Sequence, residues 1–124
     1  MNSPPNHHTV EKIGGTTMSR VNELRDTLLI GSRSGADLYN RIFVVSAFGG
    51  ITALLLEHKK TGEQGVYAAF ADSETDDHAW MAALKKTGAA MEEAHRAVLD
   101  HPADIADAND FVAERMAGAR SCVT

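Results

Sequence analysis

Two turns with the same pattern constrain the fold of this chain more than any other feature. In each turn, an apolar stretch typical of a β-strand runs into a pair of glycines and then into hydroxyl residues that can open a helix. The two sequences are Val10-Glu11-Lys12-Ile13-Gly14-Gly15-Thr16-Thr17 and Val44-Val45-Ser46-Ala47-Phe48-Gly49-Gly50-Ile51-Thr52. Adjacent glycines let backbone N–H groups approach an anion closely, and Lys12 adds a full positive charge. The first turn therefore has the chemistry of a phosphate-binding site.

The segment between the two turns predicts a helix, so the chain begins with a strand, a helix and a second strand. We expect the strands at residues 8–13 and 42–47, and we expect the helix to begin at a Ser19 cap and to end at Gly31. Its apolar positions recur at helical spacing at Val21, Leu24 and Leu28. The unbroken apolar run of the second strand favours a parallel sheet that is buried on both faces. Such a crossover places both glycine turns at the same carboxyl edge of the sheet, where ligands of open α/β folds bind.

The second half of the chain is predicted to be mainly helical. A short helix should begin at residue 51 or 52 and stop near Gly62, and residues 66–71 fit either a strand or a short buried helix. Acidic residues at 72–77 are expected to cap a long helix, whose apolar stripe consists of Trp80, Leu84, Thr87, Met91, Ala94 and Val98. A last helix should contain Pro102 in its first turn, have Gly118 at its end, and turn inward Ile105, Ala108, Val112 and Met116.

Only two strands are predicted with this pattern, and a parallel sheet of two strands is too small to be covered and closed alone. We therefore expect either further strands beyond Thr124 or a second subunit to complete the fold. Residues 1–6 are expected to form a disordered arm, which precedes a domain at residues 7–124.

Composition and charge narrow the class of partner. The 124 residues carry a formal net charge of -5, which argues against nucleic acid or an anionic membrane as the main partner. The single cysteine, Cys122, cannot form an internal disulfide. The sequence contains neither the apolar core of a signal peptide nor a run long enough to span a bilayer, so we expect a cytoplasmic protein.

The turn at Lys12 differs from the common phosphate-binding motifs, because a P-loop lysine directly follows the last glycine and the dinucleotide motif needs a third glycine. The residues instead resemble aspartate kinases. The segment 12–17 resembles the Lys-Phe-Gly-Gly-Thr-Ser opening of that family, and the segment 44–52 resembles its Val-Val-Ser-Ala-x-x-Gly-x-Thr motif. Residues 39–67 look like the specialised aspartokinase of ectoine-producing bacteria, so the resemblance covers nearly the whole chain after residue 6.

The resemblance implies an amino acid kinase fold, a three-layer α/β/α sandwich with a parallel sheet core, of which this chain would be the N-terminal part with a helix-rich second half. It implies transfer of the γ-phosphoryl group of ATP to the side-chain carboxylate of L-aspartate, with Mg²⁺ carried by the nucleotide and a homo-oligomer at full length. The family's Ser-x-Gly-Glu segment, later catalytic aspartate, nucleotide pocket and regulatory ACT domains have no counterpart here, so the resemblance indicates a fragment.

The same resemblance assigns roles to individual residues. Lys12 matches the catalytic lysine that binds the ATP phosphates, and the phosphate loop matches Gly14, Gly15 and Thr16. The aspartate-binding positions match Thr17, Ser46, Gly50 and Thr52. This chain departs from the family at Ile13, which replaces phenylalanine, and at Thr17, which replaces serine and keeps the hydroxyl.

Other candidate groups have simpler interpretations. Glu92 and His95 have the spacing of a di-iron helix, but the sequence has no second copy of that motif, so we expect no metal ligands. Cys122 has no histidine near it in the sequence and is not expected to be a nucleophile. Two alternatives to an aspartate kinase stay open: a catalytically silent domain that binds phosphate or serves in assembly, and an enzyme of the same fold with another acceptor.

Overall fold

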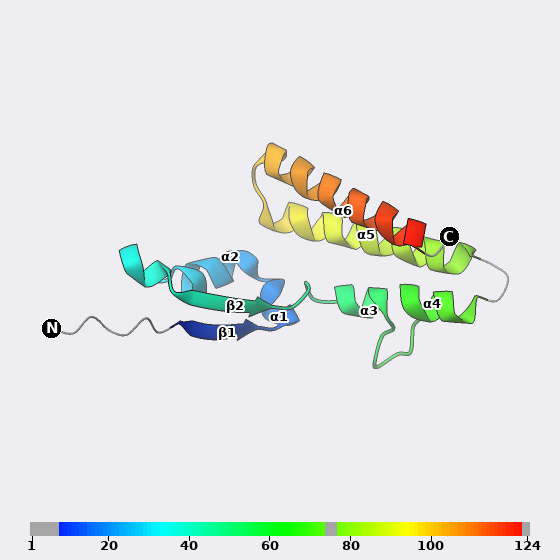
Figure 1. Ribbon diagram of the computed structural model, residues 1–124, viewed down its shortest axis with the longest axis horizontal. Coiled ribbons are helices and arrows are strands. Elements are labelled where there is room, and N and C mark those ends of the chain that lie inside the picture. Colours follow the sequence, from blue (N-terminus) through cyan, green and yellow to red (C-terminus); the bar gives the residue numbers. More distant parts are fainter. Residues whose placement is uncertain (1–7, 74–76, 123–124) are drawn as a thin grey trace. The chain divides into compact units, whose positions relative to one another are not determined.

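The computed structural model describes residues 8–73 and 77–122, and it divides into two compact units between Gly49 and Gly50 (Figure 1). The first unit contains β1 (Thr9–Ile13), α1 (Gly15–Met18), α2 (Val21–Leu24), the π-helical turn η1 (Arg25–Leu29), the 3-10 helix η2 (Gly35–Leu38) and β2 (Arg41–Val45). The second unit contains α3 (Ile51–Leu55), α4 (Val66–Asp72), α5 (His78–Val98) and α6 (Pro102–Cys122). The described part of the chain is thus mixed α/β, with a small sheet and mostly helices. The predicted arm at residues 1–6 lies outside it.

The two strands of the first unit are parallel, as the sequence predicts, and Lys12 is opposite Val44 in their register. The ladder is extended by a hydrogen bond from the Ser46 N–H to the Ile13 carbonyl, with a length of 3.0 Å. Side chains alternate between the two faces of a strand, so Lys12 shares a face with Val10. Their strand partners on this face, Ile42 and Val44, are about half exposed. The expected burial of the second strand on both faces is therefore wrong for the described chain, in which one sheet face is open.

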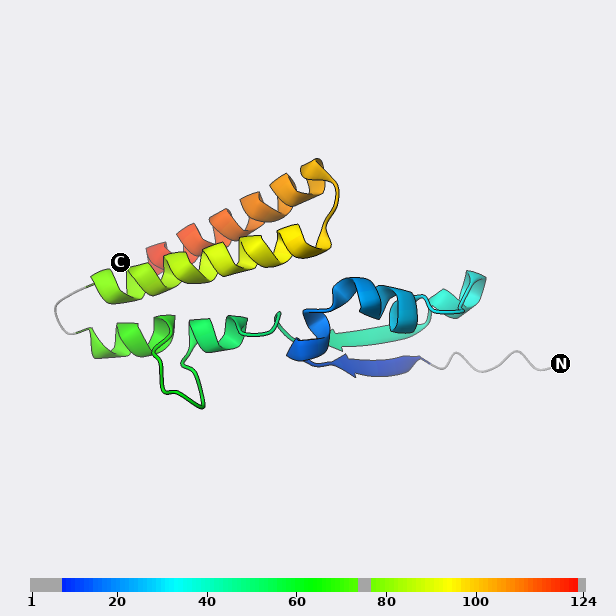
Figure 2. The same cartoon turned by 180° about the vertical axis from the view of Figure 1, so that it is seen from behind.

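The helical segment between the two strands covers one face of the sheet (Figure 2). Arg41 joins this face to the helical segment. Its guanidinium donates to Glu11 Oε2 on β1, and Nη1 and Nη2 donate to the carbonyls of Leu29 and Leu28 at 2.6 and 2.9 Å. The same group lies over the ring of Phe43, with 4.6 Å to the ring centroid. The Arg41 side chain is only 6% exposed, and each of its three guanidinium nitrogens meets an oxygen of the chain. This contact holds β1, β2 and η1 together.

The helix predicted between Ser19 and Gly31 is divided into several short pieces. Arg20, not Ser19, occupies the N-cap position of α2, and no side-chain hydrogen bond caps this helix. The expected Ser19 cap is therefore wrong, and the Ser19 hydroxyl instead accepts a hydrogen bond from the Gly49 N–H. Gly31 has a backbone φ of +55° and ends the helical segment, as predicted.

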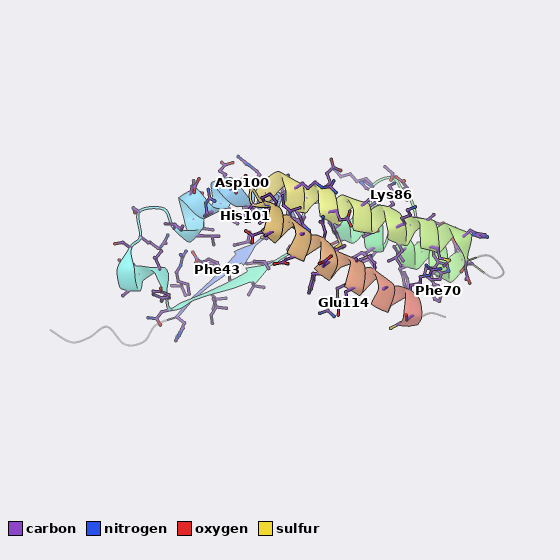
Figure 3. All side chains as sticks on the ribbon, turned by 90° about the horizontal axis from the view of Figure 1, so that it is seen from above. Phe43, Phe70, Lys86, Asp100, His101 and Glu114 are labelled. Atoms are coloured by element: carbon purple, nitrogen blue, oxygen red, sulfur yellow. The ribbon has the colours of Figure 1, made fainter. Side chains whose placement is uncertain are left out.

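The second unit is helical throughout its regular structure. Residues 66–71, which the sequence left open, form the helix α4. The helix α3 ends at Leu55, earlier than the predicted stop near Gly62, and a turn and an antiparallel bridge between Glu57 and Gln64 follow. The helices α5 and α6 pack against each other and are joined by a short connection at Asp100 and His101 (Figure 3).

The core of the second unit gathers around Trp80 on α5. Its ring meets the ring of Phe70 edge-on at 5.8 Å, and both Ala69 and Leu84 are buried beside it. The Trp80 indole N–H donates to Asp77 Oδ1 at 2.9 Å. Asp77 is the N-cap residue of α5 but makes no side-chain capping bond, so the expected capping is wrong at this residue, and residues 74–76 lie outside the described ranges.

The predicted apolar stripes of the two long helices are confirmed. On α5, Trp80, Leu84 and Thr87 are buried, while the later members of the stripe are half-buried. On α6, Val112 is buried and its predicted companions Ile105, Ala108 and Met116 are half-buried. Gly118 does not end α6, which continues to Cys122, because a glycine costs a helix only about 1 kcal/mol. Within the described ranges, no helix has the length and apolar character that crossing a bilayer requires.

We predict that Arg41→Met destabilises the first unit by about 2–4 kcal/mol, because it leaves the Leu28 and Leu29 carbonyls and the half-buried Glu11 carboxylate without their donor. Urea unfolding, followed by the amide NMR signals of β1 and β2, measures the change. Arg20→Met is the matched control, because Arg20 pairs with Glu23 on the exposed surface and should contribute less than about 1 kcal/mol. Equal effects of the two substitutions would contradict this role of Arg41.

We also predict opposite effects for two glycine-to-alanine substitutions in the second unit. A Cβ at Gly65 would collide with the Leu54 carbonyl oxygen and would lie 2.7 Å from the carbonyl oxygens of Ala53 and Leu56. Gly65→Ala should therefore cost about 2 kcal/mol or more. A Cβ at Gly118 in α6 would meet nothing within 4 Å, so Gly118→Ala should stabilise the helix by about 0.5–1 kcal/mol. Thermal unfolding followed by circular dichroism checks both signs.

Candidate phosphate-binding site

The first glycine turn lies at the carboxyl end of β1 and leads directly into α1. Gly14 is the N-cap residue of this four-residue helix, with an extended backbone, and its carbonyl accepts from the Met18 N–H at 2.9 Å. The Gly15 carbonyl accepts from the Ser19 N–H at 3.1 Å. Bonding within the turn thus uses the carbonyls, whereas the first N–H groups of a helix have no partner inside it. The N–H groups at the start of α1 are therefore the candidate donors for an anion.

The second glycine turn contacts the first at the same edge of the sheet. Ser46 follows β2 directly and donates its N–H to the Ile13 carbonyl. Three residues later, the Gly49 N–H donates to Ser19 Oγ at 2.7 Å. A Cβ built on Gly15 would lie 3.2 Å from the Ala47 carbonyl oxygen, so the backbones of the two turns are in close contact. The predicted meeting of the turns at one edge is confirmed.

The structure brings six of the predicted site residues to these two turns. They are Lys12, Gly14, Gly15, Thr16, Thr17 and Ser46, and all but Gly15 are exposed. Lys12 extends from the open face of the sheet, next to the end of β1. A cation, several backbone donors and three hydroxyls are therefore available to a ligand at this edge. Their roles toward ATP or aspartate stay predictions.

The remaining two predicted site residues, Gly50 and Thr52, belong to the second unit and are described within it. Gly50 is the N-cap residue of α3 and has a left-handed backbone with a φ of +86°. Only glycine adopts this conformation without strain, so the backbone alone explains a glycine at this position. Thr52 is exposed in the first turn of α3.

The glycines of the site differ in how much space surrounds them. A Cβ on Gly14 would meet nothing within 4 Å, whereas a Cβ on Gly49 would lie 2.7 Å from Ser19 Oγ. A side chain at position 49 would thus collide with Ser19, whereas a side chain at position 14 would meet no other part of the chain. The bond of Ser19 to Gly49 could not be predicted from the sequence, because a serine before an apolar helix has the pattern of a cap. This bond spans 30 residues and leaves no local signal.

Glu92 and His95 lie on α5, and Cys122 lies at the end of α6. No cluster of three or more His, Cys, Asp or Glu side chains within residues 8–73 and 77–122 could hold a metal ion. Glu92 lies near Arg96, with 3.8 Å between the carboxylate and guanidinium atoms. Cys122 is an exposed free thiol at the end of α6.

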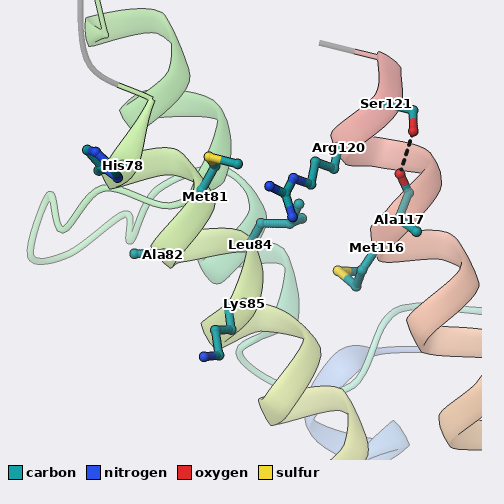
Figure 4. A pocket seen from close by; sticks show the side chains of 9 residues that line it. All are labelled: His78, Met81, Ala82, Leu84, Lys85, Met116, Ala117, Arg120 and Ser121. Atoms are coloured by element: carbon teal, nitrogen blue, oxygen red, sulfur yellow. Dashed lines mark hydrogen bonds between the residues drawn. The ribbon is translucent and has the colours of Figure 1, made fainter. Parts of the chain in front are cut away.

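A separate groove of about 730 Å³ lies in the second unit between the start of α5 and the end of α6 (Figure 4). Met81 and Leu84 line it from α5, and Met116 and Arg120 line it from α6. Its lining contains none of the predicted site residues, so this groove plays no part in the phosphate site.

The chain has a clear similarity to one curated protein. It is 49% identical over 116 residues to the aspartate kinase Ask_Ect of Stutzerimonas stutzeri (strain A1501). The match covers 94% of this chain and 24% of the relative, so the chain spans about a quarter of the relative's length. The resemblance to aspartate kinases that the motifs indicated is confirmed. No protein-family model matches the chain, and no solved structure gives a significant match.

We predict that Gly14→Ala leaves the free energy of unfolding unchanged within about 0.5 kcal/mol, because the new methyl group meets open space and the backbone is already extended. Gly15→Ala is the matched comparison and should cost about 1 kcal/mol, since its methyl group presses on the Ala47 carbonyl. Urea unfolding of the two variants gives the comparison. A larger loss for Gly14→Ala would show that Gly14 serves the fold.

Proposed function

We propose that this chain supplies the phosphate-binding part of an aspartate kinase, which transfers the γ-phosphoryl group of Mg-ATP to the side-chain carboxylate of L-aspartate. One observation carries the proposal: two glycine turns contact each other at the end of a lysine-bearing strand in a chain that is 49% identical to an aspartate kinase. The product is 4-phospho-L-aspartate.

The proposed reaction asks the protein mainly to hold two anions close together and to stabilise charge on the group that moves. An oxygen of the aspartate carboxylate attacks the γ-phosphorus, and the bond from this phosphorus to the bridging oxygen of the β-phosphate breaks. ADP leaves with that electron pair. The Lys12 ammonium and the N–H groups of the 14–16 turn are placed at one strand end, where they can donate to the phosphate oxygens.

The local geometry fits this division of tasks. Gly14 has no neighbour within 4 Å of a Cβ position, which leaves space for a phosphate to approach the backbone. Lys12, two residues before Gly14 in the chain, is exposed and is not engaged by a carboxylate in any described ion pair. A phosphate can therefore reach both groups without displacing a partner of Lys12.

The acceptor side of the proposed site consists of hydroxyls and backbone. We assign Thr17, Ser46, Gly50 and Thr52 to the binding of L-aspartate. A hydroxyl can donate to either carboxylate of the amino acid, and a glycine lets the backbone approach the substrate. Thr17 and Ser46 follow β1 and β2 in the first unit, so these two proposed acceptor contacts lie at the same sheet edge as the proposed phosphate donors.

The proposal extends to the whole protein. We infer an amino acid kinase sandwich in which further strands or a second subunit cover the open sheet face, where Val10, Ile42 and Val44 are exposed. Magnesium arrives with the nucleotide, the protein works in the cytoplasm of an ectoine producer, and it forms a homo-oligomer. The similarity to an aspartate kinase and the apolar exposure of the sheet support these inferences.

We predict that Mg-ATP raises the melting temperature of the chain and that Lys12→Ala removes most of this shift, because a ligand that binds only the folded state stabilises it. Where 4-phosphoaspartate is formed and trapped as its hydroxamate, Lys12→Ala should lower the rate by about 100-fold or more. Lys60→Ala is the control, because Lys60 is also exposed but lies in a turn of the second unit. It should leave both the shift and the rate unchanged.

The outcomes of this experiment separate the candidate functions. Measured in a protein that contains the rest of the kinase domain, a shift with Mg-ATP but no hydroxamate from any acceptor would favour a silent phosphate-binding domain. Hydroxamate from another carboxylate, but not from L-aspartate, would favour an enzyme of the same fold with a different acceptor. No shift with Mg-ATP, or equal shifts for Lys12→Ala and the unaltered chain, would contradict the proposed binding of phosphate by Lys12 and the 14–16 turn.

A further inference from the structure

We propose that Ser19 is a positioning residue of the phosphate site, because its hydroxyl fastens the two glycine turns to each other. The inference rests on the proposed function and deepens it. It assigns a role to a residue that lies outside both glycine motifs and that neither touches the phosphate in our proposal nor contributes a charge.

The hydroxyl of Ser19 makes a hydrogen bond to each turn. Ser19 Oγ accepts from the Gly49 N–H at 2.7 Å and donates to the Gly15 carbonyl oxygen at 3.2 Å. One oxygen atom thus uses both its acceptor and its donor capacity, and the two partners are 34 residues apart along the chain (Gly15 to Gly49). We name this pair of hydrogen bonds the Ser19 latch.

The space around the latch explains two glycines of the site. A Cβ on Gly49 would lie 2.7 Å from Ser19 Oγ, which is closer than a carbon and an oxygen can approach. A Cβ on Gly15 would lie 3.2 Å from the Ala47 carbonyl oxygen. Gly15 and Gly49 therefore allow the turns to approach each other, and Gly14 is the glycine with open space for a ligand.

The latch begins where the strand ladder stops. The ladder ends with the bond from Ser46 to Ile13, three residues before Gly49. Beyond this bond, the Gly49 hydrogen bond to Ser19 ties the second turn to the helix that follows the first turn. The latch thus fixes the distance between the N–H groups at 14–16, which are proposed to bind phosphate, and Ser46, which is proposed to bind aspartate. A displacement of about 1 Å between reacting groups can cost about 100-fold in rate, so this spacing matters for phosphoryl transfer.

The first test measures amide hydrogen exchange by NMR and Mg-ATP affinity on the whole 124-residue chain. In Ser19→Ala, the Gly49 amide should exchange about tenfold faster or more, and Mg-ATP should bind about fivefold more weakly. Ser121→Ala is the matched control, because Ser121 Oγ also donates to the carbonyl four residues earlier, at 3.0 Å, but belongs to α6. It should change neither quantity.

A double-mutant cycle isolates the contact between Ser19 and Gly49. Gly49→Ala alone should weaken Mg-ATP binding further than Ser19→Ala, because the new methyl group collides with Ser19 Oγ. In the double variant, the hydroxyl is absent and the next atom, the Gly15 carbonyl oxygen, lies 3.6 Å away. The double variant should therefore bind Mg-ATP as Ser19→Ala does. Should Ser19→Ala lose its fold, Ser19→Thr and Ser19→Val give the same comparison at equal volume, and Thr should retain the Gly49 protection.

Two results would overturn the latch: unchanged exchange of the Gly49 amide in Ser19→Ala, or an equal effect of Gly49→Ala with and without the Ser19 hydroxyl. Failure of the proposed function has a different signature, because the unaltered chain would then not bind Mg-ATP. In that case the exchange of the Gly49 amide still decides whether Ser19 fastens the two turns.

Discussion

The contacts of the Arg41 guanidinium organise the first unit. This group is almost fully buried, and it reaches Glu11 on β1 and two carbonyls at the end of η1. Because a buried cation is costly without partners, the strands and the helical segment must keep the arrangement that supplies those oxygens. The same arrangement aligns the two strands in parallel, so that both glycine turns leave the sheet at one edge. The candidate site thus depends on a contact on the covered face of the sheet.

At that edge, the glycines serve two different purposes: some allow the two turns to contact each other, and one leaves open space for an anion. Gly15 and Gly49 lie where the turns press against each other and where a side chain would collide with backbone or with Ser19. Gly14 has open space around it, which a bound anion can use. Lys12 is exposed and lies on the sheet face opposite to Arg41. The guanidinium that stabilises the fold and the ammonium that is available to a ligand are therefore on opposite faces of the sheet.

The two units bury their apolar residues in different ways. In the second unit, Trp80, Leu84 and Ala69 form a closed core among helices. In the first unit, Ile13 and Leu24 are buried, but Val10 and Val44 remain at least half exposed on the sheet. A parallel strand with an unbroken apolar run is normally covered on both faces. This exposed face is the physical feature that agrees best with a chain spanning a quarter of its relative's length.

The sequence alone determined the strand–helix–strand order, the parallel pairing and the long helices with their apolar stripes, and it indicated the Lys12 turn as a candidate phosphate site. Each of these follows from a local pattern: a run of apolar residues, a helical spacing, or a glycine pair after a strand. The resemblance to aspartate kinases was likewise contained in contiguous motifs. Local patterns therefore sufficed for the mixed α/β class and for the meeting of the two glycine turns at one sheet edge.

Tertiary structure decided which hydrogen bond a polar side chain makes when both a local and a more distant partner are possible. Ser19 has the pattern of a helix cap, but its hydroxyl bonds to Gly49, and Asp77 likewise accepts from Trp80 in place of capping α5. The helical state of residues 66–71 was settled by packing of Ala69 against the Trp80 core. A local pattern states which bonds a side chain can make, whereas the choice among them depends on which donor the folded chain brings within reach. For this protein, that choice sets the fit between the two turns of the candidate site.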